Sequence, residues 1–158
     1  MMKKGLILIM TCLMLVGMLS ACGKKSGGEV TASAEEIAKN LAENAVTSDT
    51  LSPITSDILA STYFVDMEQV EDSAAYLSTG ASACEAAVIQ CKDSGYTSEV
   101  TELFETRVKN QSDLFGSYNA GEVKKLDNAI IKTSGSYVVL FVGDDTEKAE
   151  EILSEAGF

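Results

Sequence analysis

The 158-residue chain contains no histidine and a single proline, and its 12 basic side chains are outnumbered by 24 acidic ones. Without histidine, it lacks the commonest general base and the commonest metal ligand of proteins. The acidic excess gives a formal charge of -12, which argues against a nucleic-acid partner. The chain also lacks a glycine-rich phosphate loop, a serine nucleophile elbow and a zinc motif. These absences predict a protein without catalytic activity, cofactor or resident metal.

Apolar residues are plentiful in comparison. Hydrophobic residues make up 46% of the chain and charged residues 23%. That balance is sufficient to bury a core and excludes wholesale disorder, while the lone proline and the lack of a glycine repeat exclude collagen-like chains. The length fits one ordinary domain.

The amino terminus has the pattern of an export signal. Lys3 and Lys4 precede an apolar run over residues 6–19, which is shorter than a permanent membrane span. The run ends in Leu19-Ser20-Ala21-Cys22, which resembles a bacterial lipobox. The resemblance implies cleavage by signal peptidase II between Ala21 and Cys22, and attachment of a diacylglycerol and fatty acyl chains such as palmitate to Cys22. An uncleaved anchor and an ordinary secretory signal are the alternatives.

This pattern divides the chain into three parts. Residues 1–21 are expected to be the lipoprotein signal peptide, 22–29 the lipidated cysteine with a flexible tether, and 30–158 a single domain. The mature chain keeps 10 basic and all 24 acidic residues, hence a charge of 10 - 24 = -14. We expect it to lie at the cell membrane on the extracytoplasmic side, with membrane lipid as a partner through acylated Cys22.

The first half of the domain begins with a helix. Ser33 and Glu36 form a capping-box pattern, and apolar residues recur at helical spacing from Ile37 to Ala45. A short helix is expected from Ser56 or Asp57. Strands are predicted over 74–78 and 85–91, joined by a turn-rich loop at Thr79, Gly80, Ala81 and Ser82.

The second half repeats the order of strands and helices. A long helix is predicted from Thr97 or Ser98 to Phe115, with Glu105 paired to Lys109. A hairpin follows over 129–133 and 137–142, and its second strand is apolar throughout, as suits a strand buried on both faces. A capping box from Asp144 to Glu147 starts the last helix, and Gly157 ends it so that Phe158 folds back. The expected fold is α+β: a helix, then ββα twice, with a four-stranded, mainly antiparallel sheet.

Three segments of this domain resemble a known family. Together with the lipobox they are similar to small lipoproteins of Gram-positive bacteria whose domain has no known function. The resemblance covers nearly all of the mature chain and implies an extracytoplasmic domain. It supplies no site residue. The segments are Tyr76-Leu77-Ser78-Thr79-Gly80-Ala81, Leu126-Asp127-Asn128-Ala129-Ile130-Ile131 and Gly135-Ser136-Tyr137-Val138-Val139-Leu140.

Chemically reactive candidates in the domain are few. Along one strand, Cys84 and Cys91 would be about 23 Å apart, whereas a disulfide needs less than about 7 Å between α-carbons. Buried free thiols are therefore favoured over a disulfide or a reactive nucleophile. Asp144-Asp145-Glu147 and Asp66-Glu68-Glu71 are the candidate calcium clusters, but neither has EF-hand spacing. The tyrosines are expected mostly in the core, at positions 63, 76, 96, 118 and 137.

The function predicted from these features is that of a non-catalytic interaction or binding module at the cell surface. Its partner is an envelope protein or ligand that the sequence does not identify, and the first loop to consider for binding is Thr79–Ser82. Two alternatives stay open: a sensor accessory that binds a small molecule or a cation, and a hydrolase that uses two carboxylates in a cleft.

Overall fold

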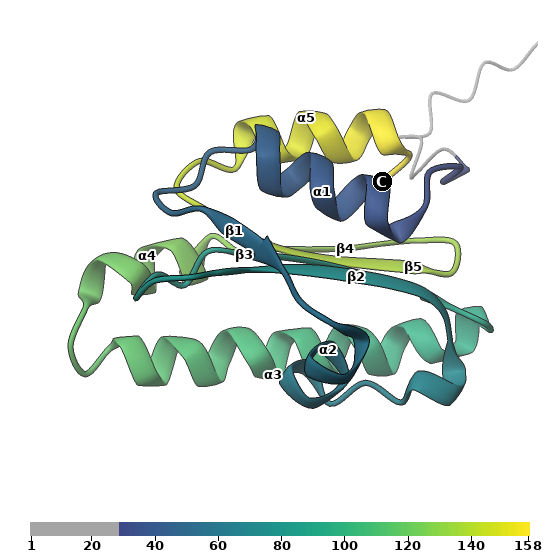
Figure 1. The fold of residues 1–158 in the computed structure, drawn as a ribbon, viewed down its shortest axis with the longest axis horizontal. Helices are drawn as coiled ribbons and strands as arrows, with labels where there is room; N and C mark the ends of the chain where they lie inside the picture. Colours follow the sequence, from purple (N-terminus) through teal and green to yellow (C-terminus); the bar gives the residue numbers. More distant parts are fainter. Residues whose placement is uncertain (1–28) are drawn as a thin grey trace, which may run out of the picture.

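The computed structural model describes residues 29–158 and arranges them in three layers (Figure 1). The predicted signal peptide, the Ala21–Cys22 cleavage site and nearly all of the tether lie outside the described residues. The elements, in chain order, are α1 (Ala34–Asn44), β1 (Leu51–Pro53), α2 (Ser56–Tyr63), η1 (Met67–Gln69), β2 (Val70–Ser78), β3 (Glu85–Cys91), η2 (Ser94–Tyr96), α3 (Thr97–Phe115), α4 (Ala120–Asp127), β4 (Ile130–Ser134), β5 (Tyr137–Val142) and α5 (Glu147–Ala156).

The middle layer is an antiparallel sheet with strand order β1-β2-β3-β5-β4. The α+β class and the antiparallel pairing are confirmed, but the predicted number of four strands is wrong, because the sheet has five. The additional strand, β1, pairs Leu51 with Ser78 and Pro53 with Tyr76 at the edge of the sheet. It has three residues and ends in proline, so it is too short to show an alternating pattern.

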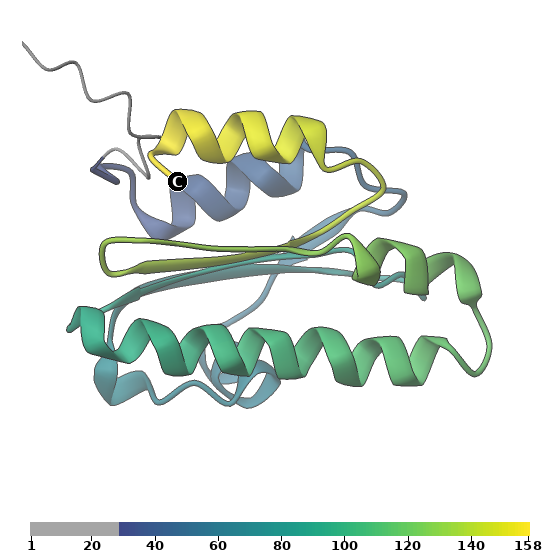
Figure 2. The same cartoon turned by 180° about the vertical axis from the view of Figure 1, so that it is seen from behind.

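Helices cover both faces of the sheet (Figures 1 and 2). α1 and α5 lie on one face, and α2 and α3 lie on the other. Side chains alternate along each strand, so successive residues of β5 enter different cores. Val139 and Phe141 pack with α1 and α5, whereas Val138 and Leu140 pack with α2 and α3. All six residues of β5 are buried, which confirms that it is covered on both faces.

The sequence gives no clear sign of α4, which follows α3 after a short turn. Only Val123 and Leu126 give this eight-residue helix an apolar side, and Gly121 weakens its helical pattern. Asn119 caps it by accepting a hydrogen bond from the Gly121 amide at 3.2 Å. The helix then leads directly into β4.

The ends of α1 and α5 test the predicted caps. At α1 the capping box is confirmed, because the Glu36 amide donates to Ser33 Oγ at 3.2 Å and the Ser33 amide donates to Glu36 Oε2 at 2.9 Å. At α5 it is wrong: the amide of Glu147 donates to Asp145 at 2.8 Å, which leaves Asp144 available for other partners.

The carboxyl end of α5 agrees with the prediction. Gly157 adopts the left-handed conformation with φ of 102°, and the amide of Phe158 donates to the Leu153 carbonyl at 2.9 Å. This turn returns the Phe158 ring to the sheet, where it meets the ring of Tyr137 edge-on with centroids 6.5 Å apart.

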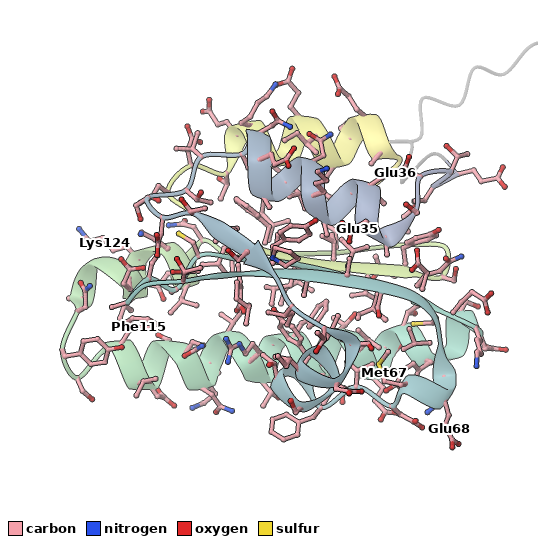
Figure 3. All side chains as sticks on the ribbon, in the orientation of Figure 1. Glu35, Glu36, Met67, Glu68, Phe115 and Lys124 are labelled. Carbon is pink, nitrogen blue, oxygen red and sulfur yellow. The ribbon has the colours of Figure 1, made fainter. Side chains whose placement is uncertain are left out.

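Four of the five tyrosines are buried, as expected, whereas Tyr118 is 62% exposed after the end of α3. Tyr76 illustrates how a buried phenol is accommodated: its hydroxyl donates to Glu35, which lies between α1 and the sheet (Figure 3). Burial, followed by the hydrogen bond to Glu35, raises the pKa of Tyr76 to about 12. The predicted Glu105–Lys109 pair is replaced by Lys109–Asp113, at 2.6 Å.

The two ends of β5 mark opposite ends of the domain. Glu29 and Val30 lie beside the β4–β5 turn, and the C-terminus is at that same end (Figures 1 and 2). α4 and the loop after β5 are at the other end. None of the helices within residues 29–158 has the length and apolarity to cross a membrane.

Candidate functional site

Lys125 lies at the centre of a polar cluster at the α4 end of the sheet. Its ammonium group lies 3.0 Å from Glu122 Oε1, 3.1 Å from Asp144 Oδ1 and 2.6 Å from Ser48 Oγ. The side chain of Lys125 is only 11% exposed. We call Ser48, Cys84, Glu122, Lys125 and Asp144 the Lys125 cluster.

The loop after β5 brings Asp144 into this cluster. The Asp144 amide donates to the Val46 carbonyl at 2.9 Å, so the α1–β1 connection lies directly against the loop. Gly143 permits this approach, because a β-carbon there would lie 2.7 Å from the Val46 oxygen and 2.5 Å from the Phe141 ring. Any larger residue at position 143 would separate the two segments.

Glu122 joins the cluster to the loop between β2 and β3. Its Oε2 accepts from the Ala83 amide at 2.8 Å and from Ser82 Oγ at 3.1 Å. The predicted binding loop Thr79–Ser82 therefore lies against the cluster through Ser82. Thr79, Gly80 and Ala81 are exposed, and the Gly80 amide donates to Asp49 at 2.9 Å. That this loop binds a ligand stays a prediction.

The charges of the cluster are stabilised by hydrogen bonds. Burial alone raises the pKa of Glu122, but donors from Ala83, Lys125 and Ser82 outweigh it and lower the pKa. For Asp144 the same competition, with Lys125 and Ser48 as donors, also lowers the pKa. Burial alone lowers the pKa of Lys125, but its bonds to the two carboxylates raise it. At neutral pH the cluster therefore contains one ammonium and two carboxylates.

This charge state limits the chemistry of the cluster. The short Lys125–Ser48 contact resembles a serine nucleophile beside a lysine base, but a protonated lysine cannot take up the serine proton. Glu122 and Asp144 are both ionised, so neither supplies a proton as a general acid near neutral pH. These contacts instead hold α4 against the loop between β5 and α5.

Cys84 lies beneath these groups, with its Sγ 3.8 Å from Lys125 Nζ and 3.7 Å from Asp144 Oδ2. It is 1% exposed and free, as is the buried Cys91. The expectation of buried free thiols is thus confirmed. The two residues belong to different cores, Cys84 to that of α1 and α5 and Cys91 to that of α2 and α3.

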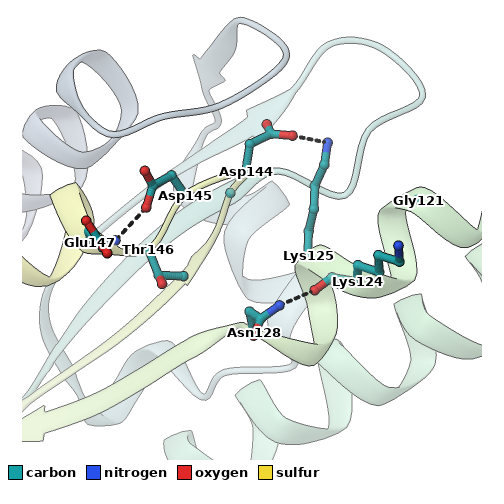
Figure 4. A pocket seen from close by; sticks show the side chains of 9 residues that line it. Gly121, Lys124, Lys125, Asn128, Asp144, Asp145, Thr146 and Glu147 are labelled. Atoms are coloured by element: carbon teal, nitrogen blue, oxygen red, sulfur yellow. Dashed lines mark hydrogen bonds and ion pairs between the residues drawn. The ribbon is translucent and has the colours of Figure 1, made fainter.

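A polar pocket of about 450 Å³ opens beside the cluster (Figure 4). One wall is formed by Gly121, Lys124 and Lys125 of α4 and by Asn128 directly after it, and residues 143–147 form the other. The Lys125–Asp144 ion pair joins these walls. Within residues 29–158, neither Lys124 nor Glu147 forms an ion pair, so both charges are available to a ligand; Asp145 also lines the pocket without an ion pair, and it accepts from the Glu147 amide.

Several carboxylates of the two candidate calcium clusters bind other groups of the protein. In the first cluster, Asp144 pairs with Lys125 and Asp145 caps α5. In the second, Asp66 accepts from the Glu68 amide and from the Gln69 side chain. No group of three or more Asp, Glu, Cys or His side chains in the described part of the chain is arranged to hold a metal ion.

A second polar cluster, which the sequence did not indicate, is buried between β3 and α3. Glu85 is 1% exposed and accepts from the Tyr63 hydroxyl at 2.9 Å and from Arg107 Nη2 at 3.1 Å. The Arg107 guanidinium lies 5.7 Å from the centre of the Tyr63 ring, a cation–π contact. Glu85 is the first residue of β3, where a charged side chain is ordinarily exposed, so no sequence pattern indicates that it is buried.

An antiparallel sheet with helices on both faces and a charged pocket at one end defines a three-layer α+β domain. The chain belongs to the family described as Domain of unknown function (DUF4358), whose model matches residues 43–143. The matched segment extends from the end of α1 through β5 and includes Ser48, Cys84, Glu122 and Lys125. No curated protein and no solved structure matches the chain.

Proposed function

We propose that this protein is a lipid-anchored, extracytoplasmic binding domain without catalytic activity, and that the pocket between α4 and the β5–α5 loop is its ligand site. The anchoring part rests on the lipobox at Leu19–Cys22. The binding part rests on one observation: opposite walls of a polar pocket present Lys124 and Glu147, and neither has an ion-pair partner within residues 29–158.

The charge of these walls favours a small zwitterionic ligand, such as an amino acid or a short peptide. Lys124 attracts a carboxylate, and Glu147 attracts an ammonium group. A volume of about 450 Å³ is within the range of small-molecule sites. A neutral sugar would leave both charges without a counter-charge, so it should bind less tightly.

The ionisation states of the Lys125 cluster favour a domain without catalytic activity over a hydrolase. Lys125, Glu122 and Asp144 hold their charges by mutual contacts, and their pKa values are shifted away from neutrality. Catalytic acids and bases usually have pKa values closer to the working pH. The Lys125 cluster is therefore better explained as a structural element that holds one wall of the pocket in place.

Anchoring is tested by replacing Cys22→Ser in cells. The variant should accumulate as an unprocessed precursor that takes up no labelled palmitate, whereas Cys84→Ser should mature and label normally. Normal processing and labelling of the Cys22→Ser protein would refute the lipid anchor and leave the pocket proposal untouched.

Ligand binding is tested by calorimetry of the purified chain with amino acids, dipeptides and neutral sugars. At least one zwitterion should bind, and Lys124→Met and Glu147→Gln should each weaken it by about tenfold, the loss of one charge-assisted contact. Lys39→Met, on the exposed side of α1, is the matched control. Tighter binding of a sugar, or no binding by any zwitterion, would contradict the proposed ligand class.

A further inference from the structure

The sheet has one long edge that no other described segment covers. β4 is the last strand in the order β1-β2-β3-β5-β4, and the opposite edge, β1, has only three residues and contains Pro53. Figure 2 shows β4 at the near edge of the sheet, between α5 above and α3 below, with no ribbon across it. Such an edge offers backbone groups that can pair with another strand.

The register identifies which residues of β4 offer these groups. Gly135 and Ser136 form a two-residue turn, so the pair Ser134–Tyr137 that closes the hairpin is hydrogen-bonded. Antiparallel pairs alternate, so Lys132 and Ile130 also bond to β5. Ile131 and Thr133 therefore direct their backbone N–H and C=O groups toward the free edge.

A groove of about 320 Å³ lies beside this edge, on the α3 side of the sheet. Its apolar lining is formed by Val108, Leu126, Ala129 and Ile131. At its rim stands Lys109, whose charge is already paired with Asp113. The other two rim charges are Glu105 and Asp127, and neither forms an ion pair within the described residues.

We propose that the free edge of β4 binds an extended segment of a protein partner as a sixth strand. In an antiparallel pairing, residues directly opposite each other share a face of the sheet. The partner residue opposite Ile131 thus directs its side chain into the groove and should be apolar. Residues two positions before and after it share that face, and Glu105 and Asp127 favour basic side chains there.

The acidity of the chain argues against a second copy as the occupant. Both copies would carry the same excess of acidic groups, 24 against 12, and their grooves would face each other with unpaired carboxylates at the rims. Repulsion of like charges disfavours that contact, whereas a basic segment is attracted. A protein segment with an apolar residue between two basic ones is therefore the fitting partner.

The probe is the peptide acetyl-KTVTK-amide, whose valine and two lysines share one face of a strand. It is added to the full chain in detergent, and amide hydrogen exchange is followed residue by residue. When about nine-tenths of the protein is bound, exchange at Ile131 and Thr133 should slow about tenfold, while Lys132 should keep its rate. Unchanged exchange at Ile131 with millimolar peptide would overturn the proposal.

Two methylated peptides test whether the contact is a strand. Methylation of the valine nitrogen removes the donor that faces Ile131, so binding should be lost. Methylation of both threonine nitrogens affects only the outer side, so binding should persist. Equal effects of the two modifications would contradict strand pairing.

Two charge reversals on α3 test the groove. Glu105→Lys should weaken the peptide about fivefold, because it places a positive charge at the rim. Glu102→Lys makes the same exposed change outside the groove lining and should leave affinity unchanged. A second copy would be the occupant if, without peptide, exchange at Ile131 became slower as the protein concentration increased and the protein had a dimeric mass. That result would refute the proposal.

Discussion

Lys125 Nζ lies 3.1 Å from Asp144 Oδ1, and this ion pair joins α4 to the loop between β5 and α5. The same ammonium group is 3.0 Å from Glu122. One largely buried lysine thus holds two carboxylates from separate parts of the chain, and its removal leaves both without their cation.

The substitution Lys125→Met tests the importance of this contact. It should lower the free energy of unfolding by about 2 kcal/mol, because the buried Glu122 and the partly exposed Asp144 both lose a charge-assisted partner. Lys124→Met, the next residue and an exposed one, should change it by less than about 0.5 kcal/mol. Urea unfolding measures both. Equal stabilities of the two variants would show that the cluster contributes little.

The same cluster predicts how stability depends on pH. The folded pKa of Glu122 lies below its ordinary value of 4.5, and that of Asp144 below 3.8. Below about pH 4.5 the unfolded chain therefore binds more protons than the folded one, and stability falls as the pH decreases through the folded values. Lys125, with a pKa raised above 10.5, loses its contribution only in strong alkali.

Urea unfolding between pH 7 and pH 3 should show this loss, and Glu122→Gln should make its slope shallower. The slope should not vanish, because the pKa values of Glu36 and Asp49 are also lowered, by hydrogen bonds from Ser33 and Ser78 respectively. An unchanged slope in Glu122→Gln would mean that the Glu122 carboxylate is no better stabilised in the folded protein than in the unfolded chain.

Glu85 should be among the most sensitive polar positions in the domain. Glu85→Ala leaves the Arg107 charge and the Tyr63 hydroxyl without their shared acceptor, and the expected cost is about 3 kcal/mol. Tyr63→Phe removes only one donor and should cost about 1 kcal/mol. The exposed Glu99→Ala is the control. Thermal unfolding followed by circular dichroism measures these costs, and a cost for Glu85→Ala no larger than that for Glu99→Ala would contradict this expectation.

Removal of Phe158 tests the closing turn of α5. Its ring packs edge-on against Tyr137, and its amide continues the hydrogen bonds of the helix end. Deletion should reduce stability by about 1 kcal/mol, and Phe158→Leu should recover part of it because an apolar contact remains. A melting temperature that deletion leaves unchanged would show that this docking is not stabilising.

The two thiols of the domain should resist modification in the native state. Cys84 and Cys91 are 1% and 2% exposed, so a thiol reagent should label them only as the protein unfolds. In the Cys22→Ser,Cys12→Ser chain, two thiols should be titrated in denaturant and almost none without it. Rapid labelling of Cys84 in the folded protein would mean that the Lys125 cluster opens.

Sequence patterns predicted the elements whose own residues carry a local signal, such as a cap or a bordered apolar segment. The bounds of β3 and β5 agree with the prediction because the apolar residues of each strand are bordered by turn residues. The cap of α1 was recognisable because Ser33 and Glu36 contact each other within one turn. β1 and α4 were missed because neither has enough apolar residues to show a period, and both are stabilised by pairing or packing with distant segments.

The site was less predictable for a related reason. Ser48 and Lys125 are 77 positions apart, and the fold alone brings them to 2.6 Å. Asp144 and Asp145 were both expected to cap the last helix, but only Asp145 accepts a hydrogen bond from the Glu147 amide, whereas Asp144 pairs with Lys125. Lys125 has an ordinary place in a weak helical pattern, so no motif distinguishes it from the exposed Lys124.

The opposite placement of Glu29 and Gly143 determines what a lipid on Cys22 would do to the pocket. Glu29 lies beside the β4–β5 turn, whereas Gly143 follows the far end of β5, about 20 Å away along six residues of strand. The field of an anionic bilayer decays over about 8 Å at physiological ionic strength. If Cys22 is lipidated and the β4–β5 end of the domain faces the membrane, the pocket lies outside the membrane's ionic atmosphere, so that solutes reach it at their bulk concentration.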